Sequence, residues 1–515
     1  MKAKLLLLFL CAVSAVLGAE FEENLRALAH AESFAEKESA IRLISSGGDD
    51  RAGTALRALL DGNLYRSNAI VAYLDDQRYI NVITLETAEG EFDKITINNR
   101  LRAIIRAELV SIDLSSPNAK TRLSAAKELL NTLEEKDLEA VKNAMLNESE
   151  SSVKKALTEA YDILCAKFES GEEQRLAIAR LRDHLSPQAL LALKQLSEEE
   201  DHPYASVIAS SIRDVESARK FYAAIETFIF GLSAASVLLF AAMGLAITFG
   251  VMKVINMAHG ELIMLGAYTT YALQQIMSVS VSIVVAIPAA FLVSAAAGIL
   301  IERLVLRRLY ARPLEALLAT FGISLILQQL VRSIFSAQNR DVKTPDWLSG
   351  SLEINGALSI TYNRLCIFLF ALAVFAFVML LLNKTSIGLK VRAVTQNRAM
   401  AQAMGVNTAF VDSLTFGVGS GIAGVAGVAL SQLTNVGPNL GQAYIVDSFM
   451  VVVFGGVGNL WGTLLGAFTL GELNKILEPF SGAMLAKIVI LIFVIMFIQK
   501  RPRGLFPQKG RDAED

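Results

Sequence analysis

The positions of hydrophobic and polar residues divide the chain into two stretches. Between residues 20 and 220, apolar residues recur at helical spacing among many Glu, Lys, Arg and Asp residues, a pattern typical of amphipathic helices in a soluble domain. From residue 222 onward the chain is a series of apolar runs, most of them long enough to cross a bilayer. We therefore expect a soluble domain over residues 20–220, a transmembrane domain over residues 221–500 and a tail over residues 501–515.

Short amphipathic helices fill the soluble stretch. The apolar spacing predicts them over Lys37–Ile44, Arg51–Leu60, Leu123–Leu130, Ala156–Leu164, Glu173–His184 and Pro187–Leu196. They form either stacked helical hairpins of the HEAT type or helix pairs without repeat symmetry. Alternating runs between acidic or glycine turns predict a small β insertion, with strands at Ile70–Leu74, Tyr79–Thr87 and Phe92–Ile97. The charged residues around these elements are either a solvated surface or a docking face for another protein.

Nine apolar segments follow in the second stretch, at residues 222–249, 259–278, 281–302, 314–336, 363–383, 408–433, 444–457, 460–477 and 484–499. The positive-inside rule assigns the basic stretches Arg303–Arg312, Lys384–Arg398 and Lys500–Arg511 to the cytoplasm. An external start and a cytoplasmic tail require an odd number of crossings, so we expect nine spans, or seven with two re-entrant segments. The predicted fold class is an all-α polytopic membrane protein with about 8–9 transmembrane or re-entrant helices, preceded by a mostly helical soluble domain with a small β insertion.

Two glycine-rich runs lie inside the apolar stretch. The segment at residues 444–457 is short for a span and leads into glycines at residues 455–458. A broken helix persists at membrane depth only where it faces protein or a water-lined path, so we expect this segment beside the substrate route. The run at residues 417–427 matches a dinucleotide-binding pattern by its letters, but without flanking strands it indicates close helix packing. The residues assigned to helix breaks or packing are Gly419, Gly421, Gly424, Gly455, Gly456 and Gly458.

Polar side chains inside the apolar runs mark the candidate substrate path, because they are costly in a bilayer and usually face the interior of a helix bundle. They are Asn256, His259, Glu261, Gln328, Asp447 and Glu472. His259 and Glu261 also suit the start of an interfacial helix, where the helix dipole favours an acidic residue. Gln328 also suits a hydrogen bond between helices. Asp447 and Glu472 admit a structural role, although a carboxylate beside a broken helix suits recognition of amide or ammonium donors.

Composition excludes several kinds of chemistry. The chain has 53% hydrophobic and 19% charged residues and a formal net charge of −2, which gives no reason to expect a nucleic-acid partner. Its three cysteines and four histidines are scattered, so we expect no disulfide framework, metal site or catalytic group. The sequence contains no phosphate-binding loop of the form Gly-x-x-x-x-Gly-Lys-Ser/Thr, so we do not expect it to hydrolyse ATP.

Residues 1–19 have the layout of a secretory signal peptide. Lys2 and Lys4 precede the apolar stretch Leu5–Leu17, and small residues follow it. The alternative is a first transmembrane helix, for which the stretch is shorter than the ~20 residues that a span requires. We expect cleavage near Glu20 and export of the soluble domain.

Three motifs of the second stretch resemble those of branched-chain amino acid type ABC importer permeases. The run Gly244–Glu261, continued to Tyr268, is similar to the opening motif of that family. The segments Phe454–Gly462 and Arg501–Phe506 are similar to later motifs, in the same order. The resemblance implies a transport subunit that is not an enzyme and binds no cofactor, with ATP and Mg used by partner subunits. The implied partners are a second homologous permease subunit, two ATP-binding subunits and an extracytoplasmic solute-binding protein. The implied location is the lipid bilayer of a bacterial inner membrane.

The stretch Ser386–Asn397, continued to Gly405, resembles the coupling loop of the family, a short helix that docks into the ATPase subunit. A basic amphipathic segment between two spans suits the transmission of a rigid-body movement, and the alternative is an ordinary cytoplasmic loop. The residues assigned to the coupling loop are Gly388, Arg392, Ala393, Gln396, Asn397 and Gly405.

The exported domain is a departure from ordinary members of this family, which begin almost directly at the first span. The run Ala55–Tyr65 resembles the urea-specific branch of the family. The resemblance therefore implies the first permease subunit of a urea importer that works by alternating access and serves nitrogen acquisition. One alternative is a permease of the same family for branched-chain amino acids or short amides. Another is a passive solute channel with a sensing domain, against which the coupling loop argues.

Overall fold

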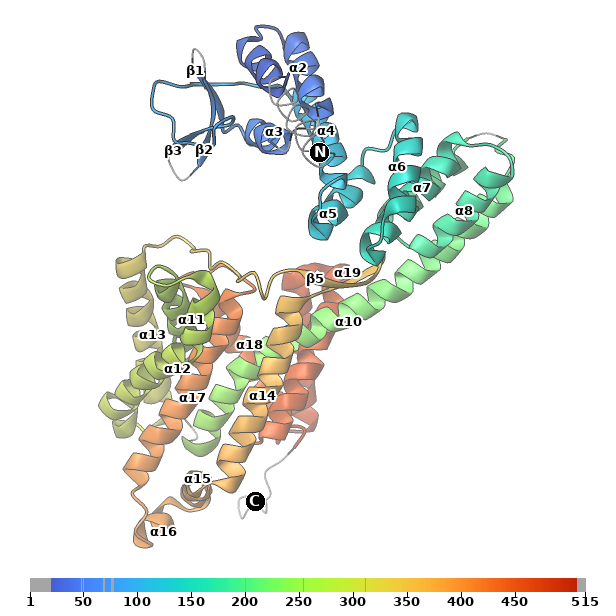
Figure 1. Ribbon diagram of the computed structural model, residues 1–515. Coiled ribbons are helices and arrows are strands. Elements are labelled where there is room, and N and C mark those ends of the chain that lie inside the picture. The colour runs from blue at the N-terminus through green and yellow to red at the C-terminus, as the bar shows by residue number, and fades with distance from the viewer. Residues whose placement is uncertain are drawn as a thin grey trace, which may run out of the picture. The chain divides into compact units, whose positions relative to one another are not determined.

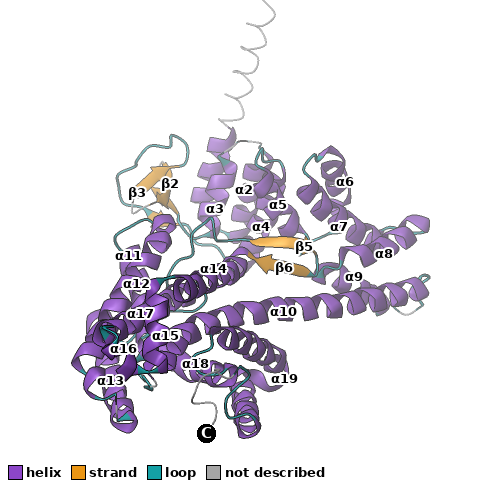
Figure 2. Cartoon of the chain, turned by 90° about the horizontal axis from the view of Figure 1, so that it is seen from below, coloured by secondary structure: helices purple, strands orange, loops and turns teal. Residues whose placement is uncertain are grey.

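The computed structural model describes residues 20–47, 49, 51–67, 70–75, 78–199, 201–252, 254–310 and 312–506. The expected signal peptide and the last part of the tail lie outside these residues. The chain divides into two compact units, Met1–Arg219 and Lys220–Asp515, called unit 1 and unit 2 below. Figure 2 shows that helices form most of each unit.

The first part of unit 1 combines helices with a small sheet. A helix over residues 20–30 is followed by α2 (Phe34–Ser46), α3 (Ala52–Leu60) and, after the strands, α4 (Asn99–Leu114). The strands are β1 (Leu64–Ser67), β2 (Ile70–Asp75), β3 (Arg78–Asn81) and β4 (Asp93–Lys94). They pair antiparallel in the order β3-β2-β1-β4. Apolar side chains of the helices and the sheet share one core.

The predicted β insertion is present, but its strands differ from the predicted ones. The strand expected over residues 79–87 ends at Asn81, and Leu85 has a positive φ of 58° in the turn that follows. A non-glycine residue with that φ does not continue an extended strand. β1 was not predicted, because only Leu64 of its four residues is buried and the apolar alternation is therefore weak.

Consecutive helices form the rest of unit 1. They are α5 (Ala119–Leu129), the 3₁₀ turn η1 (Glu135–Asp137), α6 (Leu138–Asn147), α7 (Ser151–Phe168), α8 (Glu172–His184) and α9 (Pro187–Ser197). α7 packs against α5, α6, α8 and α9, and two apolar cores lie along it. The helices predicted over residues 173–184 and 187–196 thus have nearly their expected bounds. The HEAT-type symmetry of these pairs stays a prediction.

Six helices of the described chain are long and apolar enough to cross a membrane. They are α10 (Ala205–Met252), α12 (Val279–Leu304), α13 (Pro313–Phe335), α14 (Tyr362–Lys384), α17 (Thr408–Ser431) and α19 (Leu460–Lys500). α19 has one non-helical residue, Gly482 with φ 78°, which divides it into two apolar runs. With α11 (His259–Gln274) and α18 (Leu440–Gly455), every predicted apolar segment is helical. The predicted class of an all-α polytopic membrane protein is confirmed.

The two short helices α11 and α18 begin beside each other. Each has 16 residues. Such a helix is about 24 Å long, which is less than the ~30 Å of a bilayer core. A Cβ atom on Gly260 would overlap the carbonyl group of Gly441, and one on Gly441 would overlap that of Gly260. The first turns of α11 and α18 are therefore in direct backbone contact, which only glycine allows.

Glycines also pack α17 tightly into unit 2. In its most apolar stretch of 18 residues, 89% is buried inside the protein, the largest share among the six long helices. An added Cβ on Gly419, Gly424 or Gly427 would overlap the backbone of α10, α12 or α11, respectively, and one on Gly421 would overlap the ring of Phe291. Small residues thus let α17 contact three neighbouring helices at backbone distance.

One end of unit 2 collects short helices and basic residues, and we call it the basic end. α15 (Ser386–Gln396) and α16 (Arg398–Ala403) lie there, between the end of α14 and the start of α17 (Figure 1). The 3₁₀ turn η2 (Leu306–Arg308) lies at the same end of unit 2. Its residue Arg307 donates hydrogen bonds to Ala409 and Ser413 in the first turns of α17. The opposite end of α14 follows a hairpin of β5 (Ser351–Asn355) and β6 (Leu358–Thr361), which was not predicted.

The tail folds back onto the end of α18. The backbone N–H of Leu505 donates to the carbonyl oxygen of Phe454 at 2.9 Å, and that of Phe506 donates to Gly455 at 3.1 Å. These carbonyls belong to the last turn of α18, where a helix leaves its C=O groups without intrahelical partners. Gly456 after α18 has a positive φ of 105°, and Gly504 in the tail has one of 75°. The residues Arg501–Phe506 therefore complete the hydrogen bonding of α18.

Candidate functional site

The first turn of α11 places a carboxylate beside two polar side chains of α13. Glu261 is 1% exposed, and its Oε1 accepts hydrogen bonds from Ser324 Oγ at 2.9 Å and Gln328 Nε2 at 2.7 Å. Gln328 also donates to Ser324 at 3.2 Å. The second carboxylate oxygen of Glu261, Oε2, is buried without a hydrogen-bond partner among the described residues. The predicted residues Glu261 and Gln328 are therefore in contact. Glu261 lies at the start of a helix and Gln328 makes a hydrogen bond between helices, so the structural interpretation of each residue applies.

Sequence reasoning missed Ser324, the third member of this group. It lies four residues before Gln328, so both side chains project from one face of α13. A serine in an apolar run is a weak signal, because its hydroxyl can also bond to the backbone of its own helix. Only the contact with α11 distinguishes it.

Asn256 and His259 shape the turn that leads into α11. The Asn256 Oδ1 accepts a hydrogen bond from the N–H of Ala258 at 3.0 Å, and His259 Nε2 lies 3.0 Å from the carbonyl oxygen of Ala241 in α10. A carbonyl only accepts, so Nε2 carries the proton and Nδ1 is left as an acceptor. Asn256 Nδ2 and His259 Nδ1 are buried without partners among the described residues.

The start of α11 therefore carries three buried polar atoms without partners in the described chain. They are the donor Asn256 Nδ2 and the acceptors His259 Nδ1 and Glu261 Oε2. Each unpaired buried group costs about 1–3 kcal/mol, and such groups in native proteins usually have a ligand or water to bind. We call Asn256, His259, Glu261, Ser324 and Gln328 the α11 cluster.

The two other predicted carboxylates lie apart from the α11 cluster. Asp447 of α18 accepts a hydrogen bond from Lys487 of α19 at 2.9 Å, so its charge has a partner. Glu472 of α19 packs against Gly231 of α10, and both of its oxygens are buried without partners in the described chain. Gly231 lies about 15 Å along α10 from Ala241, the residue whose carbonyl oxygen contacts His259 of the α11 cluster. Of the six predicted residues, Glu261 and Gln328 are thus in contact, Asn256 and His259 lie at the start of the same helix, and Asp447 and Glu472 have other neighbours.

Three of the six residues assigned to the coupling loop hold α15 and α16 in position. Gly388 packs directly on the backbone of Leu382 in α14, and Arg392 donates a hydrogen bond to the carbonyl oxygen of that residue. Asn397 caps α16 by accepting a hydrogen bond from Met400 N–H at 2.9 Å. The other assigned residues are Ala393, which is half-buried, Gln396, which is exposed, and Gly405, which has a positive φ of 83°.

The outward side of the same segment carries exposed apolar side chains. Leu389 of α15 is 62% exposed, and Met400 and Met404, at α16 and its C-terminal end, are 61% and 79% exposed. The inward side packs in a small core that includes Val391 and Val411. Exposed apolar residues gathered at a charged end are typical of a surface that another protein covers.

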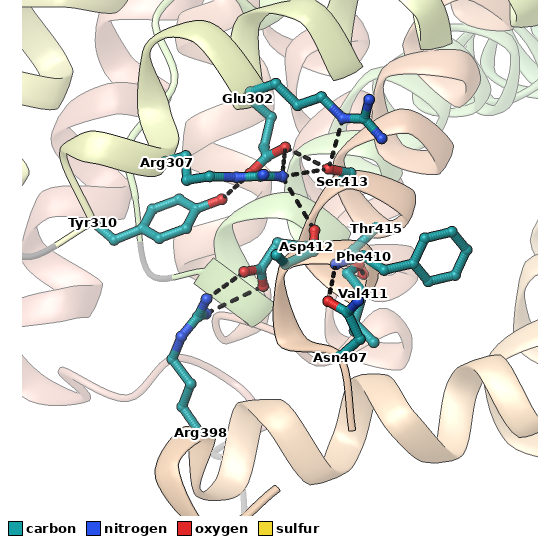
Figure 3. A network of polar contacts seen from close by, with 12 residues as sticks. Glu302, Arg307, Tyr310, Arg398, Asn407, Phe410, Val411, Asp412, Ser413 and Thr415 are labelled. Carbon is teal, nitrogen blue, oxygen red and sulfur yellow. Dashed lines mark hydrogen bonds and ion pairs between the residues drawn. The ribbon is translucent and has the colours of Figure 1, made fainter. Parts of the chain in front are cut away.

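A buried charge network at the basic end was not predicted (Figure 3). Its two carboxylates, Glu302 at the end of α12 and Asp412 in α17, have fully buried side chains. Glu302 contacts Arg307, Tyr310 and Ser413, and Asp412 contacts Arg398. In the sequence, Arg307 and Arg398 did not indicate this network, because the positive-inside rule already accounts for basic residues beside a span. The available signal was an acidic residue inside an apolar run, since Glu302 and Asp412 lie within the predicted segments 281–302 and 408–433.

The family comparison matches the membrane part of the chain. Residues 227–498 match the family described as the branched-chain amino acid transport system permease component. This range contains the α11 cluster, α15, α16 and the buried charge network. No solved structure matches the chain.

Related proteins are permease subunits of transport systems. The chain is 28% identical over 299 residues to the high-affinity branched-chain amino acid transport system permease protein BraD of Pseudomonas aeruginosa, a match that covers 56% of this chain and 96% of that protein. It is 28% identical over 277 residues to the corresponding protein LivH of Escherichia coli K12, with 51% and 89% covered. A shorter match, 30% over 134 residues, covers 24% of this chain and 42% of the ribose import permease protein RbsC of Haemophilus influenzae. The chain therefore belongs to the family of branched-chain amino acid transport system permease components, as a membrane-spanning transport subunit and not an enzyme.

Proposed function

We propose that this chain is the permease subunit of an ATP-driven importer that moves urea through unit 2 by alternating access. The observation that carries the proposal is the set of unpaired polar atoms in the α11 cluster, one donor and two acceptors. Urea offers N–H donors that suit acceptors such as Glu261 Oε2 and His259 Nδ1, and a carbonyl oxygen that suits a donor such as Asn256 Nδ2. A small neutral amide can therefore pair with any of these atoms without introducing a second charge.

The charge of the cluster favours urea over an amino acid. Glu261 is bonded to Ser324 and Gln328, both of which are neutral. A zwitterionic amino acid could pair its ammonium group with Glu261, but the α11 cluster contains no lysine or arginine for its carboxylate, and a buried charge without a partner is costly. The resemblance of Ala55–Tyr65 to the urea-specific branch supports the same substrate and lies outside the range that the family comparison matches.

The second candidate substrate is a branched-chain amino acid. The names of the related proteins from Pseudomonas aeruginosa and Escherichia coli favour it, because both describe branched-chain amino acid transport. The two candidates share the permease architecture and differ only in the solute.

Uptake of labelled solutes separates these substrates. We expect that deleting the gene removes energy-dependent uptake of labelled urea under nitrogen starvation and leaves leucine uptake unchanged. Restoring the gene should restore urea uptake, which controls for effects on neighbouring genes. Loss of leucine uptake alone would transfer the proposal to the amino-acid candidate, and loss of neither would refute both.

The partners follow from the family. We propose that two ATP-binding subunits, a second permease subunit and an external solute-binding protein complete the importer, with ATP and Mg bound by the ATP-binding subunits. In this arrangement unit 1 is exported and the basic end faces the cytoplasm, as the positive-inside rule requires. The exposed side of α15 and α16 is the proposed dock for an ATP-binding subunit.

A charge placed on the dock should block transport. Changing Met404, which is 79% exposed, to Glu is expected to lower urea uptake about tenfold while leaving the amount of protein in the membrane unchanged. Met404→Leu keeps an apolar side chain and is expected to retain uptake. The measurements are initial uptake rates and the amount of ATP-binding subunit that copurifies with each variant. Normal copurification with Met404→Glu would refute the dock.

A further inference from the structure

Glu302 is the first centre of the buried network at the basic end. Its carboxylate accepts hydrogen bonds from Arg307 at 3.1 and 2.9 Å, from Tyr310 at 2.6 Å and from Ser413 at 2.6 Å. The Glu302 side chain is fully buried, and these donors offset the cost of removing its charge from water. Since Ser413 is separated from Glu302 by 111 positions, the bond ties α12 to α17.

Asp412 is the second centre. Its buried carboxylate accepts two hydrogen bonds from Arg398, at 3.2 and 2.5 Å. Such a two-bond pairing of arginine with a carboxylate fixes the orientation of both groups. Arg398 is the first residue of α16, so the pair ties the proposed dock to α17.

Tyr310 joins the two centres. Its hydroxyl donates to Glu302, and its ring faces the guanidinium of Arg398, whose central carbon lies 5.2 Å from the ring centroid. Burial and the hydrogen bond to Glu302 raise the pKa of the Tyr310 phenol above its ordinary value, so it remains a donor at neutral pH. The hydrogen bonds to Asp412 raise the pKa of Arg398, which stays charged. Figure 3 shows the hydrogen bonds of Glu302 with Arg307, Tyr310 and Ser413 and those of Asp412 with Arg398.

The helices held by this network also reach the α11 cluster. Ser294 of α12 donates a hydrogen bond to the carbonyl oxygen of Leu262 in α11 at 2.9 Å. Gly427 of α17 packs on the backbone of Ile263, in the same turn of α11. Ser294 lies about 12 Å along α12 from Glu302. A movement of the dock therefore has a continuous packed route to the start of α11 through two rigid helices.

We infer that Glu302, Tyr310, Arg398 and Asp412 form the link through which nucleotide-driven movement of the dock reaches α12 and α17. The inference rests on the proposed function, since it requires an ATP-driven importer. The described side-chain hydrogen bonds of these four residues involve neither the α11 cluster nor the exposed dock residues Leu389 and Met404, so the four act as positioning residues. Breaking the link should uncouple ATP hydrolysis from transport without preventing either assembly or ATP hydrolysis.

The test is the number of solute molecules taken up per ATP hydrolysed by the complete importer in proteoliposomes. Tyr310→Phe removes only the hydroxyl bonded to Glu302 and keeps the ring beside Arg398. Arg398→Gln removes the charge paired with Asp412. Both variants are expected to lower the solute-to-ATP ratio about tenfold, while ATP hydrolysis stays within about twofold of wild type. Arg398→Lys, which keeps the charge, should fall between Arg398→Gln and wild type.

The control is Arg312→Gln. Arg312 pairs with Glu315 at 3.2 Å on the surface of the same end, with 66% and 56% of the side chains exposed, and such pairs contribute little. Its ratio should equal that of wild type. An unchanged ratio in Tyr310→Phe and Arg398→Gln, or a parallel loss of hydrolysis and uptake, would overturn the inference. The ratio is measured with whichever of urea and leucine the wild-type importer moves, so an error in the proposed substrate is detected separately.

Discussion

Changing Glu261 to Gln is expected to lower urea uptake by about tenfold or more at low urea concentration. The amide oxygen of glutamine still accepts from Ser324 and Gln328, so the contact between α11 and α13 is kept. The unpaired acceptor Oε2, however, is replaced by an N–H donor, which faces the N–H groups of urea. Loss of a hydrogen bond to a charged group costs about 1.5–3 kcal/mol, and every 1.4 kcal/mol is about tenfold in affinity.

The expected signature is a lower maximal rate of uptake. The urea concentration for half-maximal uptake should change less, because the proposed external solute-binding protein captures urea before it reaches Glu261. Glu315→Gln is the control, since it removes a carboxylate of unit 2 that pairs with Arg312 and has 56% of its side chain exposed. Its uptake should stay within about twofold of wild type. Equal effects of both changes would show that Glu261 has no special role in urea binding.

Changing Gly441 to Val is expected to abolish uptake of any solute. The added side chain would overlap the backbone of Gly260, and a backbone contact cannot move aside as a flexible side chain can. Overpacking of this kind typically costs about 1–3 kcal/mol, and here it separates the first turns of α11 and α18. Glu261, in the same turn of α11, would lose its alignment with Ser324 and Gln328.

Gly322→Val in α13 is the control for this change. Gly322 also lies in an apolar helix, but no atom of the described residues is within 4 Å of the position that its Cβ would take. Uptake and thermal stability of the purified importer should match those of wild type in this variant and fall together in Gly441→Val. Near-normal uptake by Gly441→Val would mean that the two helices need not touch for transport.

The apolar segments could be predicted because each depends on a continuous local pattern. Hydrophobic runs of this length have few alternatives to a helix in a membrane, and glycine marked the break after Gly455 correctly. The predicted helix bounds were less accurate where a helix continues from an apolar run into a polar stretch. α10 begins at Ala205, well before the apolar run at residue 222, because a charged sequence can continue a helix outside the bilayer.

The contacts that build the site could not be predicted, because they join residues far apart in the sequence. Glu261 meets Ser324 across 63 positions, and Glu302 meets Ser413 across 111. A polar residue in an apolar run indicates that a partner exists, but it does not identify the partner. Asp447 illustrates the point, since its partner Lys487 becomes visible only when α18 and α19 are placed side by side.

The contact between the tail and α18 has a consequence for the biosynthesis of the protein. The last-turn carbonyls of α18 are paired with Leu505 and Phe506, which are translated about fifty residues later, a delay of roughly 3–10 s at ordinary elongation rates. During that interval the end of α18 must keep water, lipid headgroups or an insertion factor as its partner. The helix therefore acquires its final hydrogen bonds only as translation ends, and a ribosome stalled before Leu505 would leave α18 unfinished in the membrane.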